Sequence, residues 1–131
     1  MKTPYKMAFA GALGAVVGAI GMAAFAAQTA APPAYYVGNV QEVKDPDAYK
    51  AYADRVAGTL TAYRGKFLVR GAEPVIVDRS AKPPGYIVII QFPSMKDFRG
   101  WWDSPAYSTI RPIRERLTTG QNYAVEGLPP S

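Results

Sequence analysis

The side chains of this sequence that could best bind a small molecule are arginines and aromatic residues. Arg70 lies directly before Gly71, at the end of a short strand-like run. Its planar guanidinium could hold a carboxylate or another anion through two parallel hydrogen bonds. The alternative is a structural arginine that donates to backbone carbonyls at a bend. Arg114 shares a basic helical stripe with Arg111 and Arg116, a pattern typical of a solvated face near a helix C-terminus.

The chain has two tryptophans, Trp101 and Trp102, and they are adjacent. Successive residues of a helix do not face the same way, so we expect one ring in the core and the other toward a pocket or an interface. For either ring, core packing is the more common role of an aromatic side chain. Tyrosines could add hydroxyl groups to such a cavity, although most of the nine tyrosines are expected to be packing residues. The candidates are Tyr36, Tyr49, Tyr52 and Tyr107.

The composition removes several kinds of chemistry. The 131 residues contain neither cysteine nor histidine, which excludes disulfides, thiolate catalysis, His-based triads and metal sites with Cys or His ligands. Asp103 and Ser104 are best explained as helix caps, since no histidine could activate the serine. No acidic cluster has the spacing of a carboxylate-only metal site, so we expect neither a metal nor a cofactor. The 15 basic and 10 acidic residues are interspersed, which argues against nucleic-acid binding.

Residues 1–27 are predicted to be an export segment. Two lysines precede an uncharged, apolar run that ends with the small-x-small pattern Ala24-Phe25-Ala26. These features are typical of a secretory signal peptide, which we favour over an uncleaved membrane anchor, although the run is long enough to span a bilayer. The folded part would be periplasmic or secreted after cleavage, or anchored with its domain outside the cytoplasm. Residues 28–33 would form a linker.

The folded part is expected over residues 34–127. Tyr and Val residues predict a strand over 34–43. Asp45, followed by a proline, is typical of a helix start. Apolar residues at helical spacing predict a helix from 46 to about 63, and Gly65 is expected to end it.

Two further strands follow that helix. Residues 66–70 predict the first, and Gly71 is expected to make a bulge or bend in it. Residues 74–78 (Pro-Val-Ile-Val-Asp) are expected to continue that edge of the sheet or to form its hairpin arm. Residues 79–85 contain Pro-Pro-Gly and predict a loop. Residues 86–92 are apolar at nearly every position, which predicts a strand buried on both faces.

Two more helix starts precede the last strand. Ser94 and Ser104 each have the pattern of a helix N-cap. Pro112 is expected to kink or divide the second of these helices, and Gly120 to close it. The last strand and the tail are predicted at 121–127 and 128–131.

This β-α-β-β-α-β order predicts an α+β, ferredoxin-like domain. Its two main helices would cover one face of the sheet. The strand at 86–92 is apolar on both sides, and a domain of this length has no third layer to cover the other face. Because an exposed apolar face of several hundred Å² favours association, we expect a homodimer with a barrel-like interior.

Several separated motifs stand in a characteristic order along residues 34–127: Tyr49-x-x-Tyr52, Val69-Arg70-Gly71, Ile90-Gln91-Phe92-Pro93-Ser94, the run from Trp101 to Tyr107, Arg114 and Val125-Glu126-Gly127. Together they resemble the domain of unknown function family 1330. The resemblance implies a dimeric α/β-barrel fold, and it favours Arg70 and Arg114 as anion contacts. It implies no activity.

Three hypotheses of function follow. The first is a binding module whose aromatic-lined cavity holds a small anionic or aromatic molecule, with Arg70 and Arg114 anchoring charge and Trp101, Trp102 and Tyr107 lining the wall. The second is a cofactor-independent oxygenase- or isomerase-like enzyme on the same fold, in which Asp103 is the first candidate for proton transfer. The third is a structural, envelope-associated protein.

Overall fold

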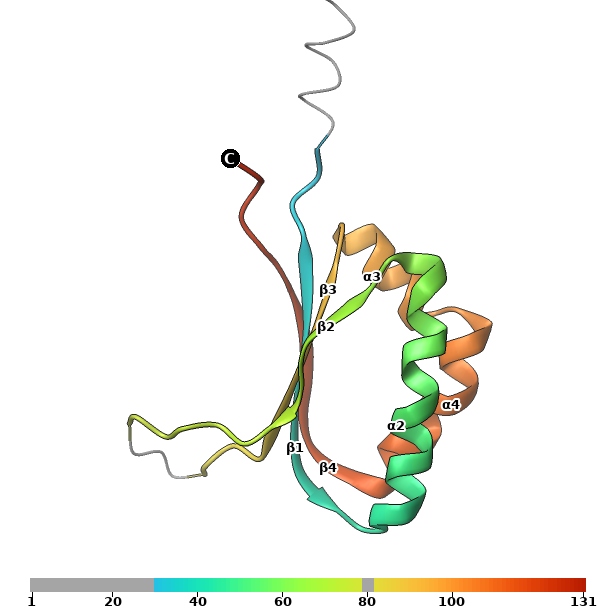
Figure 1. Ribbon diagram of the computed structural model, residues 1–131, viewed down its shortest axis with the longest axis vertical. Helices are drawn as coiled ribbons and strands as arrows, with labels where there is room; N and C mark the ends of the chain where they lie inside the picture. The colour runs from blue at the N-terminus through green and yellow to red at the C-terminus, as the bar shows by residue number, and fades with distance from the viewer. Residues whose placement is uncertain (1–29, 79–81) are drawn as a thin grey trace, which may run out of the picture. The chain divides into compact units, whose positions relative to one another are not determined.

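The computed structural model describes residues 30–78 and 82–131 (Figure 1). The predicted leader at 1–27 and the start of the predicted linker lie outside these ranges. Among the described residues, no helix combines the length and the hydropathy needed to span a bilayer. The elements of the unit Ala31–Ser131 are, in chain order, β1 (Ala34–Val43), α2 (Pro46–Leu60), the 3₁₀ turn η1 (Thr61–Tyr63), β2 (Lys66–Ala72), β3 (Tyr86–Phe92), α3 (Met95–Trp102), α4 (Pro105–Leu117) and β4 (Thr118–Glu126).

The four strands of the described residues form one antiparallel sheet in the order β2-β3-β1-β4. In the register, Tyr36 of β1 stands between Ile90 of β3 and Ala124 of β4. The helices α2, α3 and α4 all cover the same face of this sheet (Figure 1). The predicted ferredoxin-like arrangement is therefore confirmed, with the second helical segment divided into α3 and α4.

Side-chain caps fix where the helices begin. The Asp45 carboxylate accepts a hydrogen bond from the backbone N–H of Ala48 at 3.1 Å. Ser94 accepts one from the N–H of Asp97 at 3.1 Å, and Ser104 accepts one from the N–H of Tyr107 at 3.2 Å. All three caps were predicted, and each satisfies a backbone donor that the first helical turn leaves without a partner.

The core lies between the helices and the covered face of the sheet, and it is unusually aromatic. The rings of Trp101 and Tyr107 stack at a centroid distance of 4.0 Å, and the Phe92 ring lies 5.3 Å from Trp101. Ile90 and Ile110 complete the most deeply buried set. This stack joins α3 and α4 to the centre of the sheet, so it fixes the orientation of the helices that line the site described below.

The prediction for residues 74–78 needs correction. Residues 74–78 form no strand: Val75 and Val77 are 87% and 88% exposed. Pairing between β2 and β3 ends at Ala72, just after the predicted bulge at Gly71, whose φ is 76°. Beyond it, Pro74 has no N–H to donate to a ladder. The apolar segment therefore leaves the sheet and extends on the side opposite the helices (Figure 1).

The helix ends also differ from the predictions. The left-handed residue after α2 and η1 is Arg64, with φ 56°, rather than Gly65. Pro112 does not divide α4, which is continuous because buried residues on both sides of the proline hold it against the core. Gly120 does not close α4; the helix ends at Leu117, and Gly120 lies inside β4 with φ 140°.

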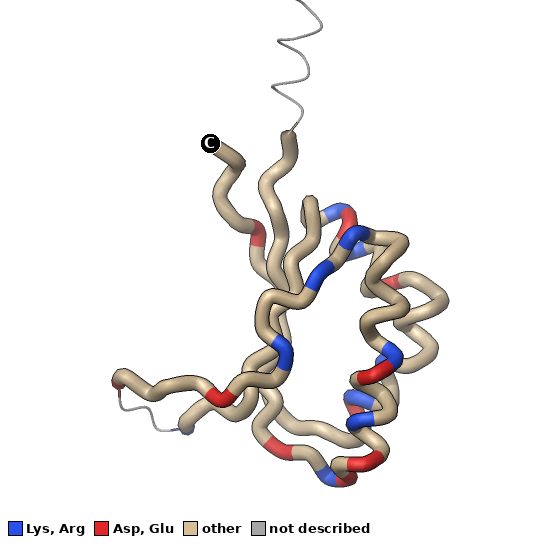
Figure 2. Tube along the Cα trace, in the orientation of Figure 1, with Lys and Arg blue, Asp and Glu red and all other residues tan. Residues whose placement is uncertain are grey.

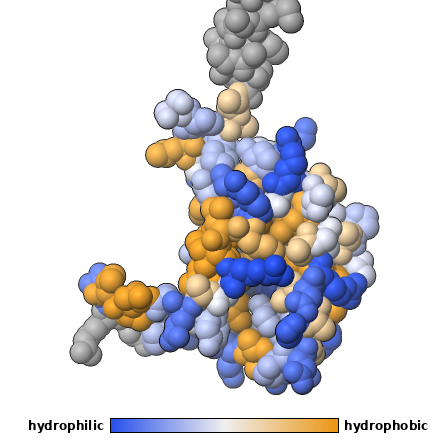
Figure 3. Space-filling model, in the orientation of Figure 1, coloured by the Kyte–Doolittle hydropathy of each residue, from blue (hydrophilic) through white to orange (hydrophobic). Residues whose placement is uncertain are grey.

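No helix of the described residues covers the other face of the sheet, which is largely apolar, as predicted. Charged residues lie mainly on the helices, at strand ends and in connecting segments (Figure 2). Hydrophobic residues gather over the sheet and again on the segment after β2 (Figure 3). By strand alternation and register, the residues on this face include Tyr35, Val37, Ile87, Ile89, Tyr123 and Val125, of which Tyr123 and Val125 are about half exposed.

Candidate functional site

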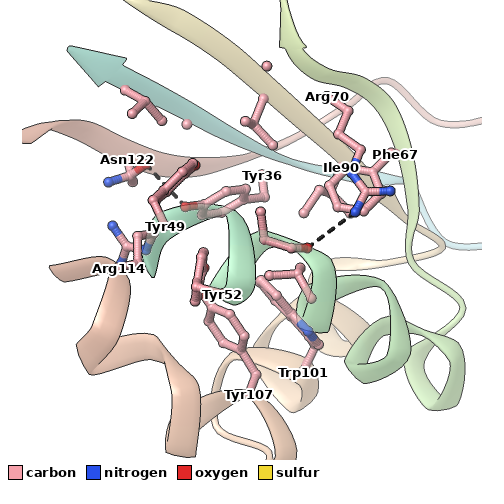
Figure 4. A pocket seen from close by; sticks show the side chains of 16 residues that line it. Tyr36, Tyr49, Tyr52, Phe67, Arg70, Ile90, Trp101, Tyr107, Arg114 and Asn122 are labelled. Carbon is pink, nitrogen blue, oxygen red and sulfur yellow. Dashed lines mark hydrogen bonds between the residues drawn. The ribbon is translucent and has the colours of Figure 1, made fainter. Parts of the chain in front are cut away.

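A cavity of about 120 Å³ lies between the sheet and the helices α2 and α4 (Figure 4). Its walls are largely aromatic and aliphatic, and a small set of polar groups lies among them. That set comprises the hydroxyls of Tyr36, Tyr49, Tyr52 and Tyr107, the guanidiniums of Arg70 and Arg114, and the amide of Asn122.

Helical and strand periodicity bring these groups together. Tyr49 and Tyr52 are three residues apart on α2, and their rings lie 5.7 Å from each other. Tyr107 and Arg114 are seven residues apart on α4, which places them two turns apart on one face. Asn122 pairs in register with Gly38, two residues beyond Tyr36 on β1, so strand alternation points it to the same side of the sheet.

Two hydrogen bonds order the hydroxyl groups. The hydroxyls of Tyr52 and Tyr107 lie 2.8 Å apart in a buried contact, in which either oxygen can be the donor. The Tyr36 hydroxyl donates to Oδ1 of Asn122 at 3.1 Å (Figure 4). Each bond joins two separate elements, so the polar groups are held in place before any ligand arrives.

Three tyrosines of the cavity, Tyr36, Tyr49 and Tyr52, are neutral at physiological pH. Burial raises the pKa of Tyr36 well above its usual range, an effect that Arg114 only partly offsets. Burial also raises the pKa of Tyr49 and, more strongly, that of Tyr52, where the Tyr107 hydroxyl adds to the shift. These groups therefore act as O–H donors and not as phenolate bases.

Arg114 is the unusual residue of the cavity. It is only 8% exposed, and its Nε is a buried donor with no hydrogen-bond partner among the described residues. The described lining contains no Asp or Glu. Its guanidinium lies 5.9 Å from the Trp102 ring, a distance at which the cation–π attraction is weak. A buried cation is normally paired with an anion, and the described residues that line this cavity supply none.

The basic stripe on α4 therefore needs a partial correction. Arg116 is exposed, as expected for a solvated face, whereas Arg114 points into the cavity. Arg111 lies between these cases: its guanidinium stacks 4.5 Å over Trp102 and donates to the backbone carbonyl of that residue at 2.9 Å. The spacing of the three arginines on the helix is consistent with three different environments, but their charges alone do not show which arginine is buried.

Arg70 lies at the exposed rim of the same cavity. Its Nη2 donates to the backbone carbonyl of Ala53 on α2 at 3.2 Å, and its guanidinium lies 4.4 Å over the Phe67 ring. These are the contacts expected of a structural arginine, and they place its charge beside the opening. Its role as an anion contact stays a prediction.

The two tryptophans do face different ways. Trp101 is buried, donates from Nε1 to Thr59 at 2.9 Å and contributes to the cavity wall. Trp102 is half-buried and lines a separate hollow beside α3. Asp103 is exposed and follows the last turn of α3, so it does not line the inner cavity. Sequence reasoning missed Asn122, whose signal was a polar residue at an inward position of the last strand.

Among the described residues, no group of three or more acidic side chains could hold a metal ion. The arrangement is rich in hydrogen-bond donors and poor in acceptors. Such a set of donors matches the hydrogen-bonding needs of an oxygen-rich or anionic group. This defines the class of the protein: a ferredoxin-like α+β domain with a donor-rich cavity between its helices and its sheet.

The chain belongs to the family described as Domain of unknown function (DUF1330), whose model matches residues 33–128. The family resemblance inferred from the sequence is thereby confirmed. A comparison with curated protein sequences finds no match.

Solved structures share the fold at low sequence identity. A protein of unknown function from Rhodopseudomonas palustris, RPA0582, is 19% identical, with 83% of this chain and 92% of that one covered and a TM-score of 0.61. SnoaB, a cofactor-independent oxygenase from Streptomyces nogalater, is 15% identical over 72% of this chain and 92% of its own, with a TM-score of 0.52. A dimeric ferredoxin-like protein of unknown function from Thermobifida fusca is 13% identical over 73% and 90%, with a TM-score of 0.50.

Proposed function

We propose that this protein binds a small organic anion, a carboxylate or an enolate, in the cavity between its helices and its sheet. The observation that carries the proposal is the buried guanidinium of Arg114, whose Nε has no partner and beside which the described lining has no acid. A bound carboxylate would supply the missing acceptor and the missing negative charge. The hydroxyls of Tyr52 and Tyr107 share one hydrogen bond, so whichever of the two keeps its proton free would donate to the same oxygens.

The walls indicate the rest of the ligand. The cavity volume of about 120 Å³ is close to that of an engineered apolar cavity of about 150 Å³ that holds one benzene ring. Tyr49, Trp101 and Phe67 offer ring faces and edges to such a group. The best fit is therefore a carboxylate attached to a single planar ring, for which benzoate is a convenient probe.

Calorimetric titration with benzoate tests the proposal. Arg114→Met removes the anchor and keeps an unbranched apolar side chain, and a charge-assisted hydrogen bond of about 1.5–3 kcal/mol corresponds to a loss of about tenfold or more in affinity. Arg116→Met, on the same helix but exposed, is the matched control and should leave the affinity unchanged. Equal binding by the native protein and the Arg114 variant would overturn the proposal.

We also propose that the protein is a homodimer that pairs through the apolar face of the sheet. The solved structure from Thermobifida fusca, which shares the fold, is described as dimeric, and a second copy would cover the face that the helices leave open. The exposed segment 74–77 extends on that side (Figure 1) and would lie against the partner. Val37→Lys, at the centre of the face, should give monomers in sedimentation velocity, whereas Ala57→Lys, exposed on α2, should not. Dimers of unchanged affinity in the Val37 variant would exclude this interface.

An enzyme that acts without a cofactor is the second candidate. It is supported by the shared fold with SnoaB, which is described as a cofactor-independent oxygenase, and by a donor-rich cavity suited to an enolate. Against it, the described lining contains no carboxylate to accept a proton. Oxygen uptake with an acidic phenol as substrate, lost in Arg114→Met, would favour the enzyme over the binding module.

We propose, from the sequence alone, that residues 1–27 direct the chain out of the cytoplasm and are then removed. The alternatives are an uncleaved anchor and a structural, envelope-associated role. N-terminal sequencing of the protein from fractionated cells distinguishes them. A mature chain that begins near residue 28 in the soluble fraction supports cleavage, and an intact chain in the membrane fraction contradicts it.

A further inference from the structure

A second hollow, of about 450 Å³, lies beside the cavity, between α3 and the edge strand β4. Its floor is aromatic, since Phe98 and Trp102 lie with their ring centroids 5.9 Å apart. Ala124 of β4 forms part of the opposite wall. Arg99 and Asp103, both exposed, lie at its rim. The hollow has the lining of a site for an apolar group, but it has no buried charge of its own.

The cavity and the hollow share two residues, Tyr36 and Asn122, which line both. These are the partners of the 3.1 Å hydrogen bond between the Tyr36 hydroxyl and Oδ1 of Asn122. The partition between the two spaces therefore includes one ring and one side-chain amide, joined by a single bond between neutral groups.

Gly38 leaves the space that the side chains of Tyr36 and Asn122 occupy. A Cβ at Gly38 would lie 2.9 Å from Oδ1 of Asn122 and 3.4 Å from the Tyr36 ring. Any larger residue would push the amide away from its place. The backbone of β1 thus leaves space for the pair, and the pair stands where a longer molecule would have to pass.

We infer that the cavity and the hollow are two halves of one site, and that the pair Tyr36 and Asn122 determines how long a ligand it accepts. The ligand class is an elongated carboxylic acid: its carboxylate is held by Arg114, and its apolar or aromatic tail passes the pair and packs on Trp102. Trp102 already joins the halves, because its ring lies 5.9 Å from the Arg114 guanidinium and also lines the hollow. This inference rests on the proposed function, since it takes the anion anchor as given.

Calorimetric titration of the full-length protein with two acids tests the inference. Benzoate fills the inner cavity only, whereas 4-phenylbutyrate carries its ring three methylenes farther. The native protein should bind 4-phenylbutyrate more tightly than benzoate, since each buried methylene adds about fourfold in affinity.

Two substitutions should move the affinity for the long acid in opposite directions. Asn122→Ala opens the partition and should raise the affinity for 4-phenylbutyrate by about fivefold or more, and Ala124→Leu fills the hollow and should lower it by a similar factor. Ala124→Leu should leave benzoate within about twofold, as should the control Gln121→Ala, which is exposed on the strand beside Asn122. Because the Asn122 amide also lines the inner cavity, the measure for Asn122→Ala is the ratio of the two affinities, which should shift by about fivefold or more toward 4-phenylbutyrate. If Asn122→Ala does not fold, Tyr36→Phe serves in its place, because it keeps the ring and removes only the hydrogen bond.

The outcomes separate the two proposals. If benzoate binds through Arg114 but the changes at 122 and 124 affect both acids alike, the two-part site is wrong and the proposed function stands. If neither acid binds the native protein, the proposed function fails and the two-part site fails with it. If the affinity for 4-phenylbutyrate rises selectively in Asn122→Ala and falls selectively in Ala124→Leu, the result supports both the proposed function and the two-part site.

Discussion

Replacing Arg114 by methionine should make the ligand-free protein more stable, although it should weaken anion binding by about tenfold or more. The guanidinium is 8% exposed, its Nε has no partner, and the described lining of the cavity holds no carboxylate. Burying a charge without a counter-charge is costly. Methionine fills a similar elongated volume with an apolar and adaptable chain. The substitution therefore removes a source of instability from the empty cavity.

The magnitude follows from the groups involved. A buried donor without a partner costs about 1–3 kcal/mol, and replacing buried charged groups with apolar ones is often neutral or stabilising by about 1–4 kcal/mol. Against this gain stand the hydrogen-bond interaction of Arg114 with the Tyr107 side chain and its attraction to Trp102, which at 5.9 Å is worth at most about 0.5–1 kcal/mol. We expect a net gain of about 1–2 kcal/mol, which corresponds to a rise in Tm of roughly 4 °C or more in a domain of this size.

Thermal unfolding followed by circular dichroism, without added anion and at equal protomer concentration, measures the effect. Arg116→Met is the control, because that arginine is exposed near the helix C-terminus and its loss should lower stability by less than about 1 kcal/mol. A Tm of Arg114→Met several degrees below that of the native protein would refute the reasoning. It would mean that Arg114 is a structural residue whose partners stabilise α4, and that the cavity needs no anion.

Two further predictions concern pH and backbone. Because burial raises the pKa of Tyr52 above the unfolded value of about 10, its contribution to stability is complete below pH 10 and is lost as the pH rises toward the folded value, by about 1.4 kcal/mol per pH unit. Tyr52→Phe should therefore lessen the loss of stability above pH 10 in urea titrations; an unchanged slope would contradict this. Gly120→Ala should destabilise the protein by about 2 kcal/mol or more in the same assay, because φ at Gly120 is 140° and the new Cβ would meet the carbonyl of Asn39. The control is Gly58→Ala, on a helix surface without close neighbours, which should be neutral or stabilising. Equal effects of the two glycine substitutions would count against the backbone argument.

The sequence was sufficient to predict the strand bounds and helix caps that depend on local chemistry. The strands 34–43 and 86–92 have the predicted bounds, since their patterns reflect burial directly. The caps at Ser94 and Ser104 were also recognisable, because a short side chain before a helix has one common use. The segment 74–78 was misassigned because its β-branched residues favour a strand, whereas strand formation also requires a partner, and the bulge at Gly71 ends the pairing with β3 shortly afterwards.

The candidate site was only partly recognisable from the sequence. The sequence named Arg114 as a candidate anion contact, a role that stays a prediction. Its charge pattern equally fitted a solvated stripe, and only tertiary packing, which puts Arg114 in the cavity lining, separates it from Arg116. Asn122 was missed because one polar residue in an edge strand is common, and its meaning comes from Tyr36, which is 86 positions away in the sequence. A site built from distant elements depends on contacts between them. Local periodicity shows which way one residue faces, but it does not show which distant residue that side chain will contact.

A count of donors and acceptors links the stability of the protein to its function. Tyr36 already donates to Asn122, and the hydroxyls of Tyr52 and Tyr107 satisfy each other with one donor to spare. That spare hydroxyl proton and the unpartnered Nε of Arg114 leave the cavity with donors in excess of acceptors. A carboxylate brings acceptor sites and one negative charge, so it corrects both deficits at once, whereas a neutral amide or alcohol corrects neither the charge nor the full hydrogen-bond count. The cavity should therefore prefer anions to neutral ligands of equal shape.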